Sequence, residues 1–155
     1  MSRLVSALTA LLLLIGCDGD KGPYLSFAGG GFVFNYRIAE VYYGFVLKPE
    51  RKLPEGSVIE ARFEDPAGGP DIVIAAPARS GQLQYMFRTP AVKGVRKDKD
   101  YRVEVRLLDK PQGTALASMS RSFRSTADQS ELPDKPLVVG PGYTPNPEND
   151  ITKKP

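Results

Sequence analysis

Residues 101–107, Tyr-Arg-Val-Glu-Val-Arg-Leu, alternate strictly between apolar and charged side chains. A strand of a half-buried sheet has this period of two, because successive side chains point to opposite faces. The same alternation recurs in residues 57–64 and, with Gln82, Gln84 and Met86 as the alternating neighbours, in residues 82–88. In the latter segment it predicts an inward face made of Leu83, Tyr85 and Phe87.

Two further segments have a less regular pattern. Residues 71–76 form a short and more continuous apolar run, which we count as a further strand. In residues 115–124 the apolar face carries Ala117, Met119 and Phe123, but Arg121 falls on the same face. We therefore expect this strand to end, bulge or lie at a sheet edge near Arg121.

Residues 32–47 contain a switch of parity. The apolar side chains are even-numbered up to Ile38 and odd-numbered from Val41 onward. Since a shift of one residue exchanges the two faces of a strand, a break or bulge is expected near Ala39 and Glu40. The segment is thus predicted to supply two strands.

The strands and the turn-rich segments between them predict the fold class. Residues 24–125 contain about seven short strands with one apolar face each, and no helical pattern of useful length follows the N-terminal segment. We predict an all-β fold, an antiparallel β-sandwich of about seven strands.

Charge patterns give one testable strand pairing. The outer faces of the third and sixth predicted strands read Glu60-Arg62-Glu64 and Arg102-Glu104-Arg106. Antiparallel pairing with Glu60 opposite Arg106 matches every charge, and each pair contributes about 0.2–1 kcal/mol. A parallel arrangement would match equally well, so the charges predict adjacency and leave direction open.

The sixth predicted strand carries a family resemblance. The run from Tyr101 to Val105 resembles the opening of the sixth strand in the immunoglobulin and fibronectin type III superfold. That resemblance implies an immunoglobulin-like sandwich in which strands three and six are neighbours. It also implies that the Tyr101 hydroxyl bonds back to the preceding loop, here about residues 95–99. The chain lacks the disulfide pair and the tryptophan of antibody-type domains.

The N-terminal segment resembles the signal of a bacterial lipoprotein. Arg3 precedes an apolar stretch, residues 4–15, that is shorter than the ~20 residues a transmembrane helix needs. The run Leu14-Ile15-Gly16-Cys17 that follows resembles a lipobox. The alternative is an ordinary signal peptide that happens to contain a cysteine.

The lipobox resemblance implies where the protein resides. Residues 1–16 would be a cleaved signal peptide, Cys17 would carry acyl chains such as palmitate, and residues 17–23 would form a short tether. We therefore expect a cell-envelope protein anchored to the inner or outer membrane, with its domain facing the periplasm or the cell surface. Several acyl chains together give a stable anchor.

The composition excludes several classes of function. The chain has no histidine and one cysteine, which removes zinc sites and triads that depend on these residues. Its 21 Lys and Arg against 18 Asp and Glu are interleaved, so no basic stripe indicates nucleic-acid binding. We expect no metal, no cofactor and no catalytic residues, although a carboxylate-based hydrolase stays formally open.

Residues 126–155 differ in composition from the rest. They hold six prolines and few large apolar residues, and we predict an extended, mostly disordered tail. One apolar island, Leu137-Val138-Val139, interrupts the tail and is followed by Tyr143. It is either the end of a loose linker or a strand that docks on an open sheet edge, in this chain or in a partner.

Aromatic residues concentrate near the start of the domain. Eight of the 14 Phe and Tyr residues fall between Tyr24 and Phe45, and we interpret most of them as core. Tyr42 is the exception, because its parity opposes that of its core neighbours. The leading hypothesis is a non-enzymatic protein-binding or structural module, with a glycan-binding module as the alternative. The candidate binding residues are Tyr42, Leu137, Val138, Val139 and Tyr143.

Overall fold

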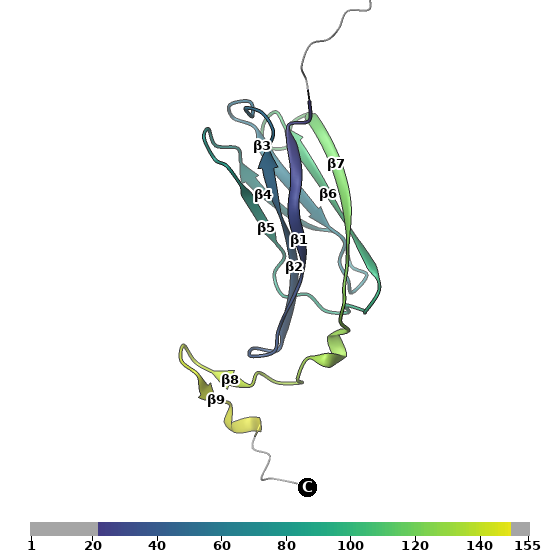
Figure 1. Cartoon of the computed structure of the whole chain (residues 1–155), viewed down its shortest axis with the longest axis vertical. Coiled ribbons are helices and arrows are strands. Elements are labelled where there is room, and N and C mark those ends of the chain that lie inside the picture. Colours follow the sequence, from purple (N-terminus) through teal and green to yellow (C-terminus); the bar gives the residue numbers. More distant parts are fainter. Residues whose placement is uncertain (1–21, 150–155) are drawn as a thin grey trace, which may run out of the picture.

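The computed structural model describes residues 22–149, and within them it shows an antiparallel all-β sandwich (Figure 1). The predicted fold class is confirmed, and seven of the strands form the sandwich. One sheet has the order β1 (Leu25–Asn35), β2 (Glu40–Pro49) and β5 (Tyr85–Arg88). The other has the order β4 (Ile72–Pro77), β3 (Val58–Phe63), β6 (Asp100–Leu108) and β7 (Ala115–Arg124).

The C-terminal part of the described chain adds shorter elements. These are the 3-10 helices η1 (Gln129–Glu131) and η2 (Pro147–Asn149) and the strands β8 (Val138–Val139) and β9 (Thr144–Pro145). The predicted signal peptide, residues 1–16, and the predicted lipidation site, Cys17, lie outside the described residues, as does most of the tether.

Aromatic rings from both sheets meet in the core. The Phe45 ring of β2 lies 5.3 Å from Phe63 of β3 and 6.2 Å from Phe123 of β7, measured between ring centroids. Phe45 therefore bridges the two sheets. Phe27, Phe32 and Phe34 are partly buried against the same cluster, which agrees with the interpretation of the N-terminal aromatics as core.

The parity switch corresponds to the turn between β1 and β2. The two strands pair from Leu25 opposite Pro49 to Asn35 opposite Glu40, and Ala39 in the turn has a φ of 54°. Phe32 and Phe34 therefore share the core face with Tyr43 and Val41, as the break near Ala39 and Glu40 predicts.

The predicted charge register between β3 and β6 is confirmed, and the pairing is antiparallel. Glu60 lies opposite Arg106 and Arg62 opposite Glu104. An Arg106 Nη1 atom lies 3.6 Å from Glu60 Oε1, whereas Arg62 Nε lies 2.8 Å from that same oxygen along its own strand. These partly exposed ion pairs tune the register more than the total stability.

Arg121 lies on an edge strand, as predicted. β7 pairs only with β6 among the strands of its sheet, and Arg121 stays exposed while Phe123 beside it is buried. The guanidinium of Arg121 lies 5.8 Å from the Phe27 ring and 5.5 Å from the Phe123 ring. An inward-pointing cation of this kind discourages another strand from adding to the edge.

The Tyr101 side chain makes the contact that the resemblance implies. It is fully buried, and its hydroxyl accepts a hydrogen bond of 2.8 Å from the main-chain N–H of Arg96. The contact joins the start of β6 to the loop that precedes it.

Replacing Tyr101 by phenylalanine should lower the free energy of unfolding by about 1 kcal/mol, because the Arg96 N–H loses its partner inside the fold. Chemical denaturation measures the effect, and Tyr143→Phe serves as the control because that ring is 77% exposed. An equal midpoint for Tyr101→Phe and the parent chain would show that this hydroxyl contributes nothing.

The inward position predicted for Leu83 is wrong. β5 begins only at Tyr85, and Leu83 is 82% exposed. The chain crosses from one sheet to the other over residues 78–84, and the Arg79 main-chain N–H donates to the Tyr85 hydroxyl at 2.8 Å. The apolar alternation therefore begins at Leu83, two residues before the strand does.

The segment after Ser125 differs from the predicted extended tail. Leu132 is 9% exposed and joins the core, so the packed unit continues beyond residue 125. η1 begins with a capping box in which Asp128 and Glu131 satisfy each other's main-chain N–H groups. β8 pairs with β9 rather than with a sheet edge, and the Leu137 N–H donates to the Arg37 carbonyl at 2.8 Å.

Candidate functional site

The buried polar side chains of the described residues serve the fold. Ser57 donates to the Pro54 carbonyl at 2.6 Å, and Thr89 Oγ1 accepts from the Tyr43 N–H at 3.2 Å. Burial, followed by the nearby Glu64 carboxylate, raises the pKa of Tyr43, whose hydroxyl donates to the Glu64 carbonyl at 2.5 Å. Within residues 22–149, no group of three or more Asp, Glu, His or Cys side chains is placed to hold a metal ion.

A shallow apolar hollow lies on the outer face of the three-stranded sheet. Its volume is about 520 Å³. The residues that face outward there are Gly31, Val33, Tyr42, Gly44, Val46, Met86 and Arg88, and we refer to this set as the outer-face hollow.

The floor of the outer-face hollow is bare main chain. Gly31 of β1 lies directly opposite Gly44 of β2, and Gly44 lies opposite Arg88 of β5. Because neither glycine has a side chain, the main chain is uncovered between the Val33–Tyr42 pair on one side and the Val46–Met86 pair on the other. A Cβ at position 44 would stand 2.3 Å from the Phe87 carbonyl oxygen, so this position requires glycine.

The walls of the outer-face hollow are aliphatic with one aromatic ring and one cation. Val33 lies opposite Tyr42, and Val46 lies opposite Met86. Val33 is 47% exposed and Met86 is 78% exposed. The Arg88 guanidinium lies over the Tyr42 ring at 4.4 Å, and among residues 22–149 no carboxylate forms an ion pair with it.

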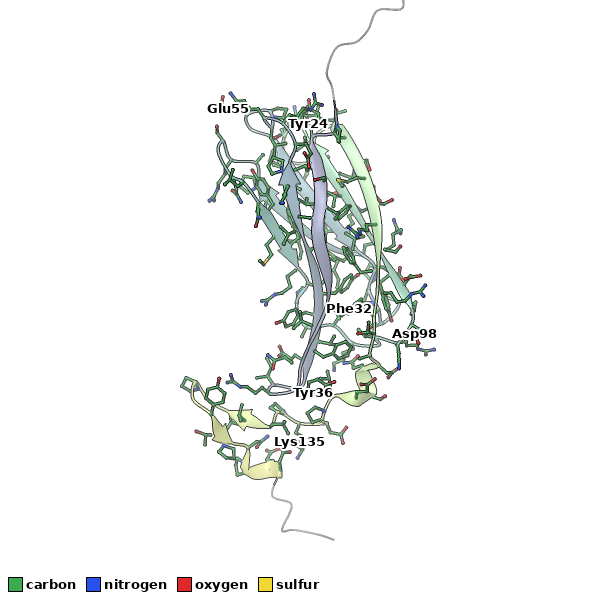
Figure 2. All side chains as sticks on the ribbon, viewed as in Figure 1. Tyr24, Phe32, Tyr36, Glu55, Asp98 and Lys135 are labelled. Carbon is green, nitrogen blue, oxygen red and sulfur yellow. The ribbon has the colours of Figure 1, made fainter. Side chains whose placement is uncertain are left out.

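A second set of exposed apolar side chains lies at the end of the β1–β2 hairpin. Figure 2 shows Tyr36 at this end, next to the segment that carries Lys135. The Arg37 guanidinium covers the Tyr143 ring at 4.1 Å, which attaches the β8–β9 hairpin to the turn. The exposed apolar side chains here are Tyr36, Ile38, Leu137, Val139 and Tyr143.

The predicted binding residues thus separate into two places. Tyr42 lines the outer-face hollow. Leu137, Val138, Val139 and Tyr143 belong to the β8–β9 hairpin and line no part of that hollow. Val138 is half-buried, while Leu137 and Val139 are 48% and 38% exposed.

Sequence reasoning missed most of the hollow. Val33, Val46 and Met86 stand at outward parity, yet they are apolar where a solvated face would carry polar residues. That contrast is a signal, and it could have identified them beside Tyr42. The two glycines are different, because their meeting across the strands depends on the exact register.

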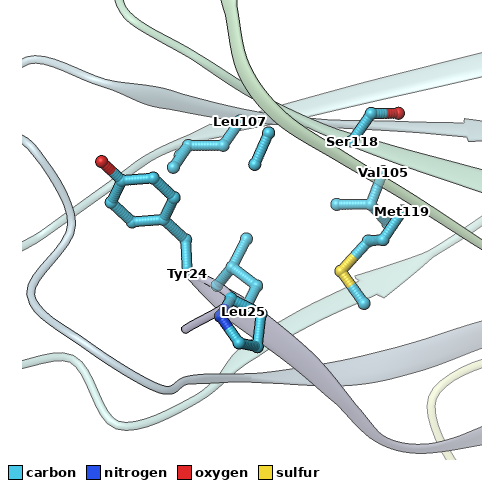
Figure 3. Close-up of a pocket in the computed structure, with 8 residues that line it drawn as sticks. Tyr24, Leu25, Val105, Leu107, Ser118 and Met119 are labelled. Carbon is cyan, nitrogen blue, oxygen red and sulfur yellow. The ribbon is translucent and has the colours of Figure 1, made fainter. Parts of the chain in front are cut away.

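A smaller apolar cavity of about 230 Å³ opens beside the first residues of β1 (Figure 3). It is lined by Tyr24, Leu25, Val105, Leu107 and Met119, among others. Leu25, Val105 and Leu107 are at most 5% exposed, so its walls are core side chains. The cavity lies where β1 faces β6 and β7 without strand pairing, and we interpret it as a packing gap rather than a recognition site.

Compared with known protein families, with curated proteins and with solved structures, the chain matches none. Over residues 22–149, no helix has the length and apolar character needed to cross a bilayer.

Proposed function

We propose that this protein is a lipid-anchored, non-enzymatic binding module whose β-sandwich recognises a protein partner through the outer-face hollow. The observation that carries the proposal is the apolar lining of a solvent-facing sheet surface. Apolar groups gathered in an exposed concavity with a few polar groups at the rim are typical of recognition sites. The Tyr101 contact and the β3–β6 adjacency support, by analogy, a relation to immunoglobulin-like domains, a superfold used widely for binding.

The lining favours a protein over a glycan as the partner. Glycan sites stack sugars on exposed rings, and the hollow offers one ring, Tyr42, whose face is already covered by Arg88. No close ring pair among the described residues includes Tyr36, Tyr42 or Tyr143. Met86, by contrast, is flexible and polarisable and adapts to apolar side chains of a partner.

Arg88 adds a prediction about the partner's chemistry. Its guanidinium lies over the Tyr42 ring at the hollow, and no carboxylate within the described residues pairs with it. A partner that places an Asp or Glu beside an apolar anchor would satisfy both features. The proposed ligand is therefore an apolar protein surface with an acidic group at its margin.

The experiment compares two substitutions of equal chemistry. The measured quantity is the amount of partner protein that co-purifies with the immobilised chain. Met86→Lys, in the hollow, should lower it at least about tenfold relative to the parent chain, which corresponds to about 1.4 kcal/mol. Leu83→Lys is the matched control, because Leu83 is 82% exposed and lies outside the hollow. Equal retention by both variants of the full chain, purified from detergent-solubilised membranes, would reject the proposed surface.

The lipid anchor is the second part of the proposal, and the lipobox resemblance at Cys17 supports it. Cys17→Ser should remove the membrane association of the chain, because serine offers no thiol for acylation. Partitioning between detergent and aqueous phases measures the change. Unaltered partitioning of the serine variant into the detergent phase would contradict lipidation at this residue.

A further inference from the structure

The four-stranded sheet ends at β4 in an edge without the usual protection against strand addition. β4 pairs with β3 on one side, and no other described strand pairs with it (Figure 1). Its sequence, Ile-Val-Ile-Ala-Ala-Pro, carries no charge and no bulge. Natural proteins usually protect such an edge with charges, prolines, bulges or covering segments, and the one proline of β4, Pro77, stands at its last position.

The hydrogen-bond pattern shows which main-chain groups are free. The Ala78 N–H donates to the Ser57 carbonyl at 2.9 Å, and β3 and β4 continue from there in an unbroken antiparallel register. Bonding pairs alternate along such a ladder, so even-numbered residues of β4 bond to β3. Val73, Ala75 and Pro77 therefore direct their main-chain groups away from the sheet.

The other margins of the sandwich are protected in ways that β4 is not. β7 carries the inward-pointing Arg121 and ends at Arg124, whose guanidinium pairs with Asp100 at 2.6 Å. β1 has a register shift between Phe27 and Gly29. β5 is only four residues long. β4 is thus the sandwich edge best suited to accept another strand.

We propose that the β4 edge pairs with the β4 edge of a second copy of this chain, antiparallel and about a two-fold axis at Ile74. In this register Val73 bonds to Ala75 of the second copy, and the reverse, so each free N–H finds a carbonyl. Ile74 meets its own counterpart, and Pro77, which lacks an N–H, falls at the end of the ladder.

Charges at the two ends of β4 support a second copy as the occupant. Asp71 precedes the strand, where it also lies 3.7 Å from Arg102 Nη2 of its own chain, and Arg79 follows the strand. The two-fold register brings Asp71 next to the end of β4 of the second copy, which Arg79 follows, so opposite charges lie near each other at both ends of the paired strands. A two-fold axis at Ala75 instead of Ile74 would place Val73 opposite Pro77 of the second copy. Since proline has no N–H, the Val73 carbonyl would then lack a hydrogen-bond donor.

The contact between two β4 strands is small, so its detection requires a method that captures a weak dimer. One strand pair buries less surface than the roughly 1,200–2,000 Å² of a stable interface, so the dimer is weak and exchanging. A covalent trap captures such a dimer. Residues opposite each other in a non-hydrogen-bonded antiparallel pair have Cα atoms about 4.5 Å apart, within the range that a disulfide spans.

The test introduces Ile74→Cys into the full chain and follows disulfide-linked dimer on non-reducing gels under mild oxidation. The parent chain, whose one cysteine is Cys17, gives the baseline, and Leu116→Cys on the opposite edge strand is the control, because Leu116 is 41% exposed. We expect dimer well above both references for Ile74→Cys. Adding Ala75→Lys, a charge on the edge, should return it to the baseline.

A second variant covers the case in which Ile74→Cys disturbs the fold. Val73→Cys lies on the outer face, where Val73 is 48% exposed, and a short thiol-to-thiol cross-linker joins two copies in the proposed register. Cross-linking that Ala75→Lys suppresses supports the β4 pairing. Dimer yields no higher than those of Leu116→Cys, or yields that Ala75→Lys leaves unchanged, overturn it.

Discussion

Replacing Phe45 by alanine is expected to lower the free energy of unfolding by about 3–5 kcal/mol, the range for a large aromatic side chain removed from a packed core. Phe45 is 2% exposed. Its ring contacts Phe27, Phe63, Phe87 and Phe123 at centroid distances of 5.2, 5.3, 5.6 and 6.2 Å. The substitution therefore opens a cavity where both sheets meet.

Denaturant unfolding monitored by circular dichroism measures this loss. Val33→Ala is the control on the opposite face of the same sheet, since Val33 is 47% exposed, and it should cost about 1 kcal/mol or less. A loss for Phe45→Ala as small as that of the control would mean that the two sheets do not share the aromatic cluster.

Truncating the chain after Ala127 is expected to lower the free energy of unfolding by about 2–4 kcal/mol. The truncation removes Leu132, which is 9% exposed against the core. It also removes Gln129, whose Oε1 accepts from the Gly94 N–H at 2.5 Å and the Val95 N–H at 3.3 Å. The loop that holds the Tyr101 hydroxyl thus loses its outer support.

The matched control for this truncation ends the chain after Leu132. It keeps η1 and Leu132 and removes only the β8–β9 hairpin and the residues around it, whose large side chains are mostly exposed. Its melting temperature should stay close to that of the parent chain. Equal melting temperatures for both truncations and the parent would show that the segment after Ser125 contributes nothing to the fold.

The alternation of apolar and polar residues predicts the sandwich, because a sheet with one buried face needs an apolar side chain at every second position of each strand. Tyr101, Val103 and Val105 face the core because their sheet has one buried face, and a register slip would expose all of them. The pairing of Glu60 with Arg106 was predictable for a related reason, since it follows from that alternation together with the charges on the outer face. The structure adds the antiparallel direction, which the symmetric charge pattern leaves open.

Single contacts between distant parts of the chain could not be predicted. Leu132 follows a proline-poor stretch of five polar or small residues, and no periodic pattern marks it as core. Its burial depends on the core cluster that it joins, whose other members come from distant parts of the chain. The prediction for Leu83 is wrong for a comparable reason, because the passage of the chain from one sheet to the other, rather than the local pattern, determines where β5 begins.

The candidate site lies between these two cases. Outward parity identified Tyr42 from the sequence, because its neighbours Val41 and Tyr43 are required in the core. The hollow itself depends on Gly31 lying opposite Gly44, and this register runs unbroken from the β1–β2 turn, where Asn35 lies opposite Glu40. A turn longer or shorter by one residue would place the two glycines out of line.

Photo-cross-linking from position 86 of the full chain in native membranes tests the proposed recognition surface most directly. A photoreactive side chain at Met86, which is 78% exposed in the hollow, is compared with the same side chain at Leu116 on the other sheet. We predict a discrete product from position 86 that protease treatment removes, with no counterpart from position 116. A product that glycosidase treatment removes instead, or identical products from both positions, would contradict protein recognition by this surface.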